Sequence, residues 1–300
     1  DIRITLKKGA DTAVVRIANY HTNIVHIERN GNVLLDLPVE AGDESGLTDR
    51  TLLSMSDIYD FAQTVDLGDV KELLDRQIEC NIAISQEGLT HSYGANIGQV
   101  IRATSPADDP IAKAKSAAAA GSDARMGGCE MPVIINSGSG NQGMTASVPV
   151  IVYGREIGVS EEKLYRALVL SNLITIHQKT RIGRLSAYCG AVSAGAAAGA
   201  GIAYLDGGGY EEITHTVVNA LAIVSGMICD GAKASCAGKI AAAIDAGVLG
   251  YRMYQNGQQF YGGDGIISQG VEKTLDNVGR LGKIGMRSTD KEILQIMLQS

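Results

Sequence analysis

Three of the five cysteines in this 300-residue chain fall late in the sequence, at Cys189, Cys229 and Cys236. Thiolates are the usual protein ligands of iron–sulfur clusters and one option for zinc. If the intervening segment is helical, Cys229 and Cys236 lie about two turns apart on one face, whereas Gly231 makes a loop an equal alternative. By spacing alone, an unpaired cysteine is most often a small buried apolar residue. Three real ligands would leave one iron of a four-iron cluster open to act as a Lewis acid.

A second chemical candidate is the glycine- and serine-rich segment Asn136–Gly143. Small residues let successive backbone N–H groups converge on an anion such as a carboxylate. The segment is not a P-loop, because no Lys-Ser or Lys-Thr follows it. A helix is expected to begin near Met144, and a tight turn between helices is the competing interpretation.

Polar residues in three other places could bind a small ligand. His21, Thr22 and Asn23 fall at the predicted junction of two strands and offer both hydrogen-bond donors and acceptors. A surface histidine beside a turn-capping asparagine is the simpler interpretation. The guanidinium groups of Arg125, Arg181 and Arg184 could grip a carboxylate, although helix-end salt bridges are a more common role.

The remaining cysteines, Cys80 and Cys129, have no companions at ligand spacing. We therefore expect them to be structural. No Ser–His–Asp or HExxH arrangement of catalytic residues is evident in the sequence.

A small sheet and a set of helices are expected to position these residues, so the predicted fold class is α+β. The N-terminal part predicts a small sheet with a hairpin turn at Asn30-Gly31. Two helices follow and are expected to cover one face of that sheet, and from about residue 93 the pattern is mostly helical. We predict a small α+β domain at 1–90 and a helical, cluster-binding domain at 91–300. The predicted strands are Ile2–Leu6, Ala13–Ile17, Asn23–Glu28 and Asn32–Leu37, and the two helices are Leu47–Asp66 and Val70–Glu79.

Composition narrows the class of partner. The net charge is −7 and the isoelectric point is near 5.3, which argues against nucleic acid or an anionic membrane as partner and favours a small soluble ligand. An odd number of cysteines without an apolar leader predicts a reducing, cytoplasmic setting. The uncharged run Leu185–Leu205 is long enough to cross a bilayer. It consists mainly of Ala, Gly and Ser, however, and so predicts a buried helix beside a site instead of a membrane span.

Six segments together resemble the L-cysteine desulfidase family, which is related to the iron–sulfur L-serine dehydratases. The likeness runs in order along nearly the whole chain. The most specific strings are Ser-Gly-Ser-Gly-Asn-Gln-Gly and Cys-Asp-Gly-Ala-Lys-Ala-Ser-Cys. The six segments are Tyr20–Glu28, Ser85–Leu89, Ser122–Gly128, Asn136–Gly143, Arg184–Ala191 and Ser225–Cys236.

The resemblance implies a lyase that eliminates a β-substituent from a small amino acid. Cys189, Cys229 and Cys236 would hold a [4Fe–4S] cluster whose open iron polarises the leaving group, and no pyridoxal phosphate is implied. L-cysteine would give pyruvate, ammonia and hydrogen sulfide through an aminoacrylate. The resemblance also implies that two segments hold the substrate carboxylate and amine, namely His21, Thr22 and Asn23 and the loop residues Ser137, Gly138, Ser139, Gly140 and Asn141.

One departure concerns the general base. Members of that family carry an N-terminal Gly-Cys-Thr-Glu-Pro segment whose cysteine is thought to act as the base, and residues 1–300 contain no match. Because the chain starts at Asp1 and not at Met, we expect the base to lie outside it, in a segment that could act as its partner. The chain alone would then bind a cluster without turnover.

Two alternatives to cysteine desulfidation stay open. L-serine or another β-substituted amino acid could be the substrate, because such small differences change binding by only about 1–3 kcal/mol. The absence of a cysteine near Ser300 mildly favours cysteine, since serine dehydratases can carry a tail cysteine that caps the open iron. A non-catalytic protein with zinc on the three thiolates, or a ligand-binding regulator, is the other alternative. The sequence leaves open whether the chain forms a homo-oligomer.

Overall fold

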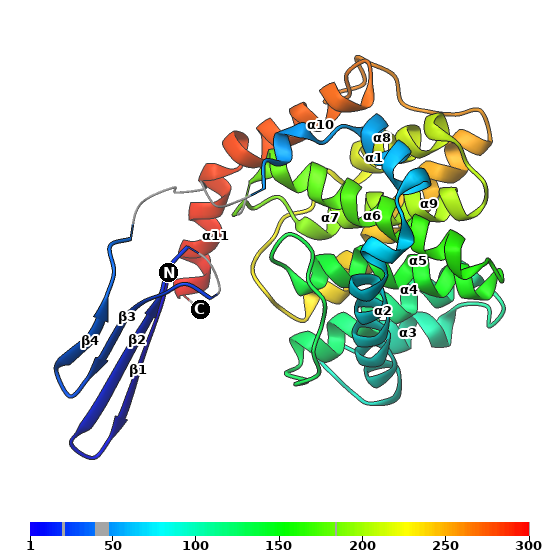
Figure 1. Ribbon diagram of the computed structural model, residues 1–300. Helices are drawn as coiled ribbons and strands as arrows, with labels where there is room; N and C mark the ends of the chain where they lie inside the picture. The colour runs from blue at the N-terminus through cyan, green and yellow to red at the C-terminus, as the bar shows by residue number, and fades with distance from the viewer. Residues whose placement is uncertain (20–21, 40–47, 184, 300) are drawn as a thin grey trace. The chain divides into compact units, whose positions relative to one another are not determined.

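The computed structural model describes residues 1–19, 22–39, 48–183 and 185–299. The chain forms two compact units, Asp1–Asp49 and Arg50–Ser300. The first contains a sheet and the second is helical, so the predicted α+β class is confirmed (Figure 1). Among the described residues, no helix has the length and apolar character needed to cross a membrane.

The first unit is an antiparallel sheet whose strands follow the chain order β1-β2-β3-β4. Asn30 and Gly31 join the last two strands with φ angles of 52° and 78°. Positive φ at both central residues is what a type I′ hairpin turn requires, so the predicted turn is confirmed. The predicted strands are confirmed to within two residues at each end. The strands are β1 (Ile2–Lys8), β2 (Asp11–Ile17), β3 (Ile24–Arg29) and β4 (Asn32–Asp36).

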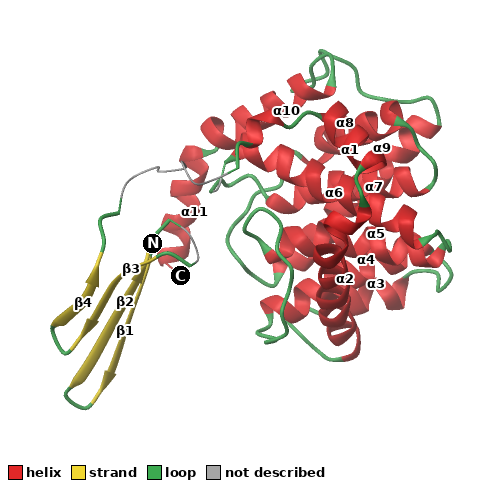
Figure 2. Cartoon of the chain, in the orientation of Figure 1, coloured by secondary structure: helices red, strands yellow, loops and turns green. Residues whose placement is uncertain are grey.

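The second unit consists of helices joined mainly by short loops (Figure 2). Several begin at the side-chain caps that the sequence offers, such as Ser54, Ser139 and Ser160, whose oxygens accept a backbone N–H of the first turn. The helices are η1 (Arg50–Leu52), α1 (Met55–Thr64), α2 (Leu67–Thr90), α3 (Ile97–Thr104), α4 (Pro110–Met126), α5 (Gly140–Glu156), α6 (Glu161–Ile182), α7 (Gly190–Leu205), α8 (Tyr210–Val224), α9 (Ser235–Gln255), α10 (Val271–Arg280), η2 (Leu281–Gly285) and α11 (Arg287–Gln299).

The boundary between the units differs from the one predicted at residue 90. Helices α1 and α2 do not form a unit with the sheet; their apolar residues Met55, Ile58 and Leu74 are buried in the core of the helical unit. The hydrophobic pattern correctly indicates helices here, but it does not specify which surface each helix covers.

Helices α7 and α9 pack unusually closely because glycines line their contact. A Cβ added at Gly195 would lie 2.5 Å from the Ala243 backbone, and one at Gly199 would lie 2.6 Å from the Gly247 backbone. Moving four residues along α7, from Gly195 to Gly199, also moves the contact four residues forward along α9, from Ala243 to Gly247. The two helices therefore run parallel. Their N-termini therefore lie at the same end of the helical unit, and these N-termini carry Cys189 and Cys236. Of the predicted buried helix over Leu185–Leu205, the part from Gly190 onward forms α7, whose residues are almost all buried, whereas Leu185 is 92% exposed.

Candidate functional site

The backbone brings Cys189 and Cys229 together directly. The Cys189 N–H donates to the carbonyl of Met227 at 3.2 Å, and the Cys229 N–H donates to the carbonyl of Ala187 at 2.6 Å. These two bonds flank a short antiparallel bridge. Cys189 is the N-cap residue of α7, while Cys236 lies in the first turn of α9. The parallel packing of α7 and α9 thus adds the third cysteine at the same end.

The segment between Cys229 and Cys236 is a loop, as Gly231 allowed. Gly231 has a φ of +94°, a conformation that other residues rarely adopt. The Cys236 thiol donates to the Gly231 carbonyl at 3.6 Å. An ion pair between Asp230 and Lys239 closes the loop onto α9. Cys229 therefore reaches the site from a closed loop and Cys236 from the first turn of α9, so the two do not lie two turns apart on one helix.

The three thiols influence one another electrostatically. Cys189 is buried, and Cys229 and Cys236 are partly exposed. Burial is the main cause that raises the pKa of the Cys189 thiol, and negative charge on Cys229 or Cys236 would raise it further. The Ala191 N–H and Lys239 act in the opposite direction. Binding to a metal would remove this penalty, because coordination deprotonates a thiol.

Two lysines lie near these sulfurs. Lys239 on α9 is within electrostatic range of Cys189 and Cys236; burial opposes its charge, but its bond to Asp230 and the nearby thiols raise its pKa overall. Lys179 on α6 is within range of Cys189 and Cys229, and burial lowers its pKa. The site therefore combines three potential thiolates with two cations.

Three thiolates are the donor chemistry of an iron–sulfur cluster and also of zinc. Within the described residues, no three His, Cys, Asp or Glu side chains are grouped closely enough to hold one metal ion. A four-iron cluster is larger than one ion and is held by thiolates spread around it. Cys189, Cys229 and Cys236 could hold such a cluster, because they come from three backbone segments that converge at one end of α7 and α9.

The glycine-rich segment forms a tight turn that leads directly into α5. Asn136 and Ser139 exchange two backbone hydrogen bonds of 3.0–3.1 Å, and the turn between them places Ser137 and Gly138 at φ angles of 49° and 84°. Ser139 caps the helix, which begins at Gly140 and not near Met144. The expected turn between helices is thus present, and a role for its residues in substrate binding stays a prediction.

This turn joins two other predicted parts of the site. The Arg125 guanidinium lies so close to Gly140 that a Cβ there would be 2.5 Å from Nε, and Nη1 donates to Asn141 Oδ1 at 3.3 Å. The next residue, Gln142, packs its side chain against Gly190, which follows Cys189. The structure therefore connects Arg125, the glycine-rich turn and the cysteine region.

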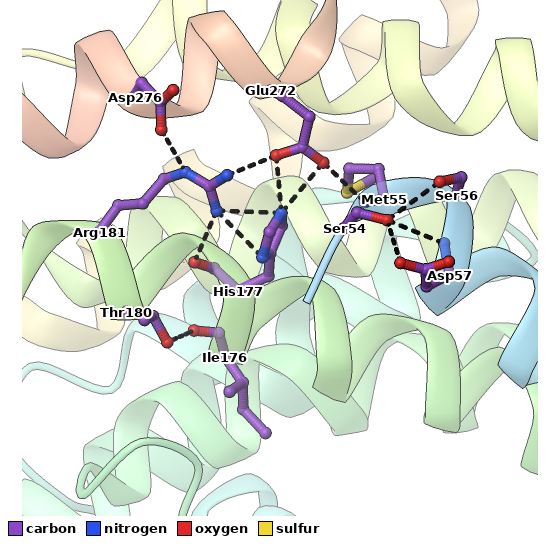
Figure 3. A network of polar contacts seen from close by, with 10 residues as sticks. All are labelled: Ser54, Met55, Ser56, Asp57, Ile176, His177, Thr180, Arg181, Glu272 and Asp276. Atoms are coloured by element: carbon purple, nitrogen blue, oxygen red, sulfur yellow. Dashed lines mark hydrogen bonds and ion pairs between the residues drawn. The ribbon is translucent and has the colours of Figure 1, made fainter. Parts of the chain in front are cut away.

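Arg181 forms salt bridges between helices, and its guanidinium group is engaged by two carboxylates of the protein. Figure 3 shows its guanidinium between Glu272 and Asp276, with Nε donating to Asp276 Oδ1 at 2.7 Å. His177 Nε2 lies 3.0 Å from the same Glu272 carboxylate, so this group links α6 to α10. The salt-bridge interpretation holds for Arg181, while Arg184 lies outside the described residues.

The first unit contains the other predicted binding segment. His21 lies outside the described residues. Thr22 is exposed, and Asn23 donates its side-chain N–H to the Ala18 carbonyl at 2.9 Å, which is the turn-stabilising contact considered for it. Substrate binding by His21, Thr22 and Asn23 therefore stays a prediction.

Cys80 and Cys129 are free cysteines, both partly exposed. Cys80 lines an open groove of about 760 Å³ along α2, together with Lys71, Asp75 and Met131. Cys129 lies near Tyr93 and helps to raise the pKa of that phenol, for which the largest cause is its bond to Glu87.

Sequence reasoning missed Gln142, Lys179 and Lys239 as neighbours of the cysteines. Lys239 follows Cys236 by three residues, a helical spacing that could have indicated a shared face. Gln142 belongs to the glycine-rich string but was not selected. Lys179 is brought close only by the packing of α6, so no local signal points to it.

Comparison with known proteins identifies relatives along the whole chain. Residues 12–295 match the family described as serine dehydratase alpha chain. The UPF0597 protein of Desulfitobacterium hafniense is 63% identical, with 99% of this chain and 69% of that protein covered. UPF0597 proteins of Lachnoclostridium phytofermentans and Treponema denticola are 51% and 48% identical; the match covers 99% of this chain in both cases and 71% and 70% of those proteins. The UPF0597 names specify no substrate.

Proposed function

This chain belongs to the serine dehydratase alpha chain family, and from that membership we propose that it carries the cluster site of an iron–sulfur lyase acting on a small β-substituted L-amino acid. The observation that carries the proposal is the convergence of Cys189, Cys229 and Cys236 at the paired N-termini of α7 and α9. A β-elimination needs a group that withdraws electrons from the leaving atom, and a metal site with an open position supplies one.

The protein's own residues would divide the work as follows. The three thiolates would hold a [4Fe–4S] cluster, which when bound would supply a Lewis-acidic iron for the β-substituent of the substrate. Lys239, tied to Asp230, offsets negative charge on Cys189 and Cys236. The turn residues Ser137–Asn141 would orient the amino acid, and Arg125 holds the turn through its hydrogen bond to Asn141. Loss of the Cα proton and the β-substituent gives an aminoacrylate, and hydrolysis of its imine form gives pyruvate and ammonia.

We propose L-cysteine as the substrate and keep L-serine as the second candidate. Cysteine is supported by the resemblance of the motif set to the desulfidase family. Serine is supported by the description of the matching family. Both substrates place a heteroatom on Cβ, so the same cluster chemistry serves either one, with hydrogen sulfide or water as the leaving product.

Metal analysis on protein prepared without oxygen tests the proposal. About four iron and four sulfide per chain, with a cluster absorption band, are expected. Stoichiometric zinc, or no metal after anaerobic reconstitution, would favour a structural metal or a binding protein instead. Pyruvate formation from L-cysteine and L-serine then separates the two substrates.

A further inference from the structure

The sheet of the first unit has one apolar face. Residues paired across neighbouring strands lie on the same face, and successive residues of one strand alternate between the two faces. One row of paired residues crosses all four strands and consists of Ile4, Val15, Ile27 and Leu35. Together with the neighbouring rows it forms the apolar face, which we define as Ile2, Ile4, Leu6, Ala13, Val15, Ile17, Ile24, Ile27 and Leu35.

The opposite face of the sheet is mainly polar. On β1 it carries Arg3, Thr5 and Lys7, which alternate with the apolar residues of that strand. A second row on this face consists of the paired residues Arg16, His26 and Asp36. The sheet therefore has the two-sided character of antiparallel sheets that pack one face on a core and turn the other to water.

The apolar face, however, is uncovered. None of its residues is buried, and on the edge strand Ile2, Ile4 and Leu6 are 54%, 49% and 67% exposed. Among the described residues of the first unit there is no helix or second sheet that could cover it. A sheet becomes stable by burying its apolar face against another layer of structure. The first unit is thus one layer of a two-layer arrangement.

The relatives contain a region of suitable size for the second layer. In the D. hafniense protein the 298 matched residues make up 69% of the length, which leaves about 130 residues outside the match. The matched share stays at 69–71% in eight relatives whose identity to this chain falls from 63% to 40%. A region that keeps its size while the sequences diverge is typical of a folded part, and about 130 residues is an ordinary domain size.

We propose that the apolar face of the sheet is the docking surface for this region of about 130 residues, which covers it with an apolar layer of its own. The proposal does not depend on the lyase function. A region in the same chain meets the face at an effective concentration on the order of millimolar, which a separate second copy does not reach in dilute solution. An intramolecular layer is therefore favoured over a dimer formed through this face.

Hydrogen exchange measured by mass spectrometry tests the proposal on two proteins, this 300-residue chain and the full-length D. hafniense protein. Exchange of the amides in β1–β4 reports how readily the sheet opens. After correction for intrinsic rates, these amides should exchange at least tenfold faster in the 300-residue chain than the aligned amides do in the full-length protein. Amides of α7, which is buried in the helical unit, should exchange equally in both proteins and are the internal control.

Two substitutions on β1 identify the face that is covered. Ile4 lies on the apolar face and the adjacent Thr5 on the opposite one, so Ile4→Asp and Thr5→Asp form a matched pair. Made at the aligned positions of the full-length protein, Ile4→Asp should speed exchange of the sheet at least tenfold, because it would bury a charge under the covering layer. Thr5→Asp should change it less than threefold, and in the 300-residue chain both should have small effects.

Equal protection of the sheet in the two wild-type proteins would overturn the proposal, and this comparison stands even if a variant does not fold. Equal effects of Ile4→Asp and Thr5→Asp in the full-length protein would overturn it as well. Light scattering decides on a second copy: a dimer of the 300-residue chain with a protected sheet, dissociated by Ile4→Asp, would show that another copy covers the face and would also overturn the proposal.

Discussion

The side chain of Gln142 rests on the backbone of Gly190, so that a methyl group at Gly190 would lie 2.7 Å from the Gln142 amide carbon. This contact joins the first turn of α5 to the first turn of α7, beside Cys189. A Cβ at Gly190 would force the buried Gln142 side chain to shift from the first turn of α7.

Gly190→Ala should therefore disturb the cysteine site. Overpacking of this kind costs about 1–3 kcal/mol, and the displaced segment carries Cys189. We expect a lower melting temperature and reduced iron retention after anaerobic reconstitution. Gly238→Ala on α9 is the control, because a Cβ there meets nothing within 4 Å. Equal iron retention in the two variants would show that the contact does not position the site.

The ligand assignment predicts a contrast between cysteines. Cys229→Ala should abolish cluster incorporation, because its backbone pairs with Ala187, two residues before Cys189, and its thiol acts electrostatically on the Cys189 thiol. Cys80→Ala should retain the cluster, since this thiol lines the groove along α2. Iron and acid-labile sulfide content measures both. The same cluster content in both variants would remove Cys229 from the ligand set.

The close approach of α7 and α9 can be tested by Gly199→Ala. Its Cβ would lie 2.6 Å from the Gly247 backbone, which cannot move aside as a flexible side chain could. We expect the free energy of unfolding to fall by about 1–3 kcal/mol in denaturant titrations. Gly226→Ala, where a Cβ meets no atom within 4 Å, should change it much less. A Gly199→Ala protein as stable as wild type would contradict the packing argument.

Sequence reasoning predicted the elements better than their assembly. Alternating residues and Asn30-Gly31 specify the sheet locally, because the turn conformation depends on the residues within it. The surface covered by α1 and α2 depends on distant partners, which periodicity does not encode. In the site, the motif strings pointed to the cysteines and the glycine-rich turn, whose roles stay predictions. Lys179 was missed because only the packing of α6 brings it near them.

The same limit applies to the group formed by His177, Arg181 and Glu272 (Figure 3). In the sequence, Glu272 lies about 90 residues from its two partners, so nothing local indicated the contact. Burial opposes ionisation of Glu272, but hydrogen bonds from His177 and the Met55 N–H, with the charge of Arg181, lower its pKa below the usual 4.5 overall. The ionised carboxylate thereby ties together α1, α6 and α10.

This group predicts a pH-dependent stability difference between wild type and Glu272→Gln. A pKa lowered by folding gives stability that is fully present above the unfolded value near 4.5 and is lost as the pH falls through the folded value. At pH 7, Glu272→Gln should be less stable by about 1–2 kcal/mol, a modest figure because the carboxylate is partly exposed. Below pH 4.5 the difference should shrink, because the wild-type carboxyl is also becoming neutral. Melting temperatures of both proteins from pH 7 to pH 3 measure it, and a constant difference over that range would mean that the ionised carboxylate does not stabilise the fold.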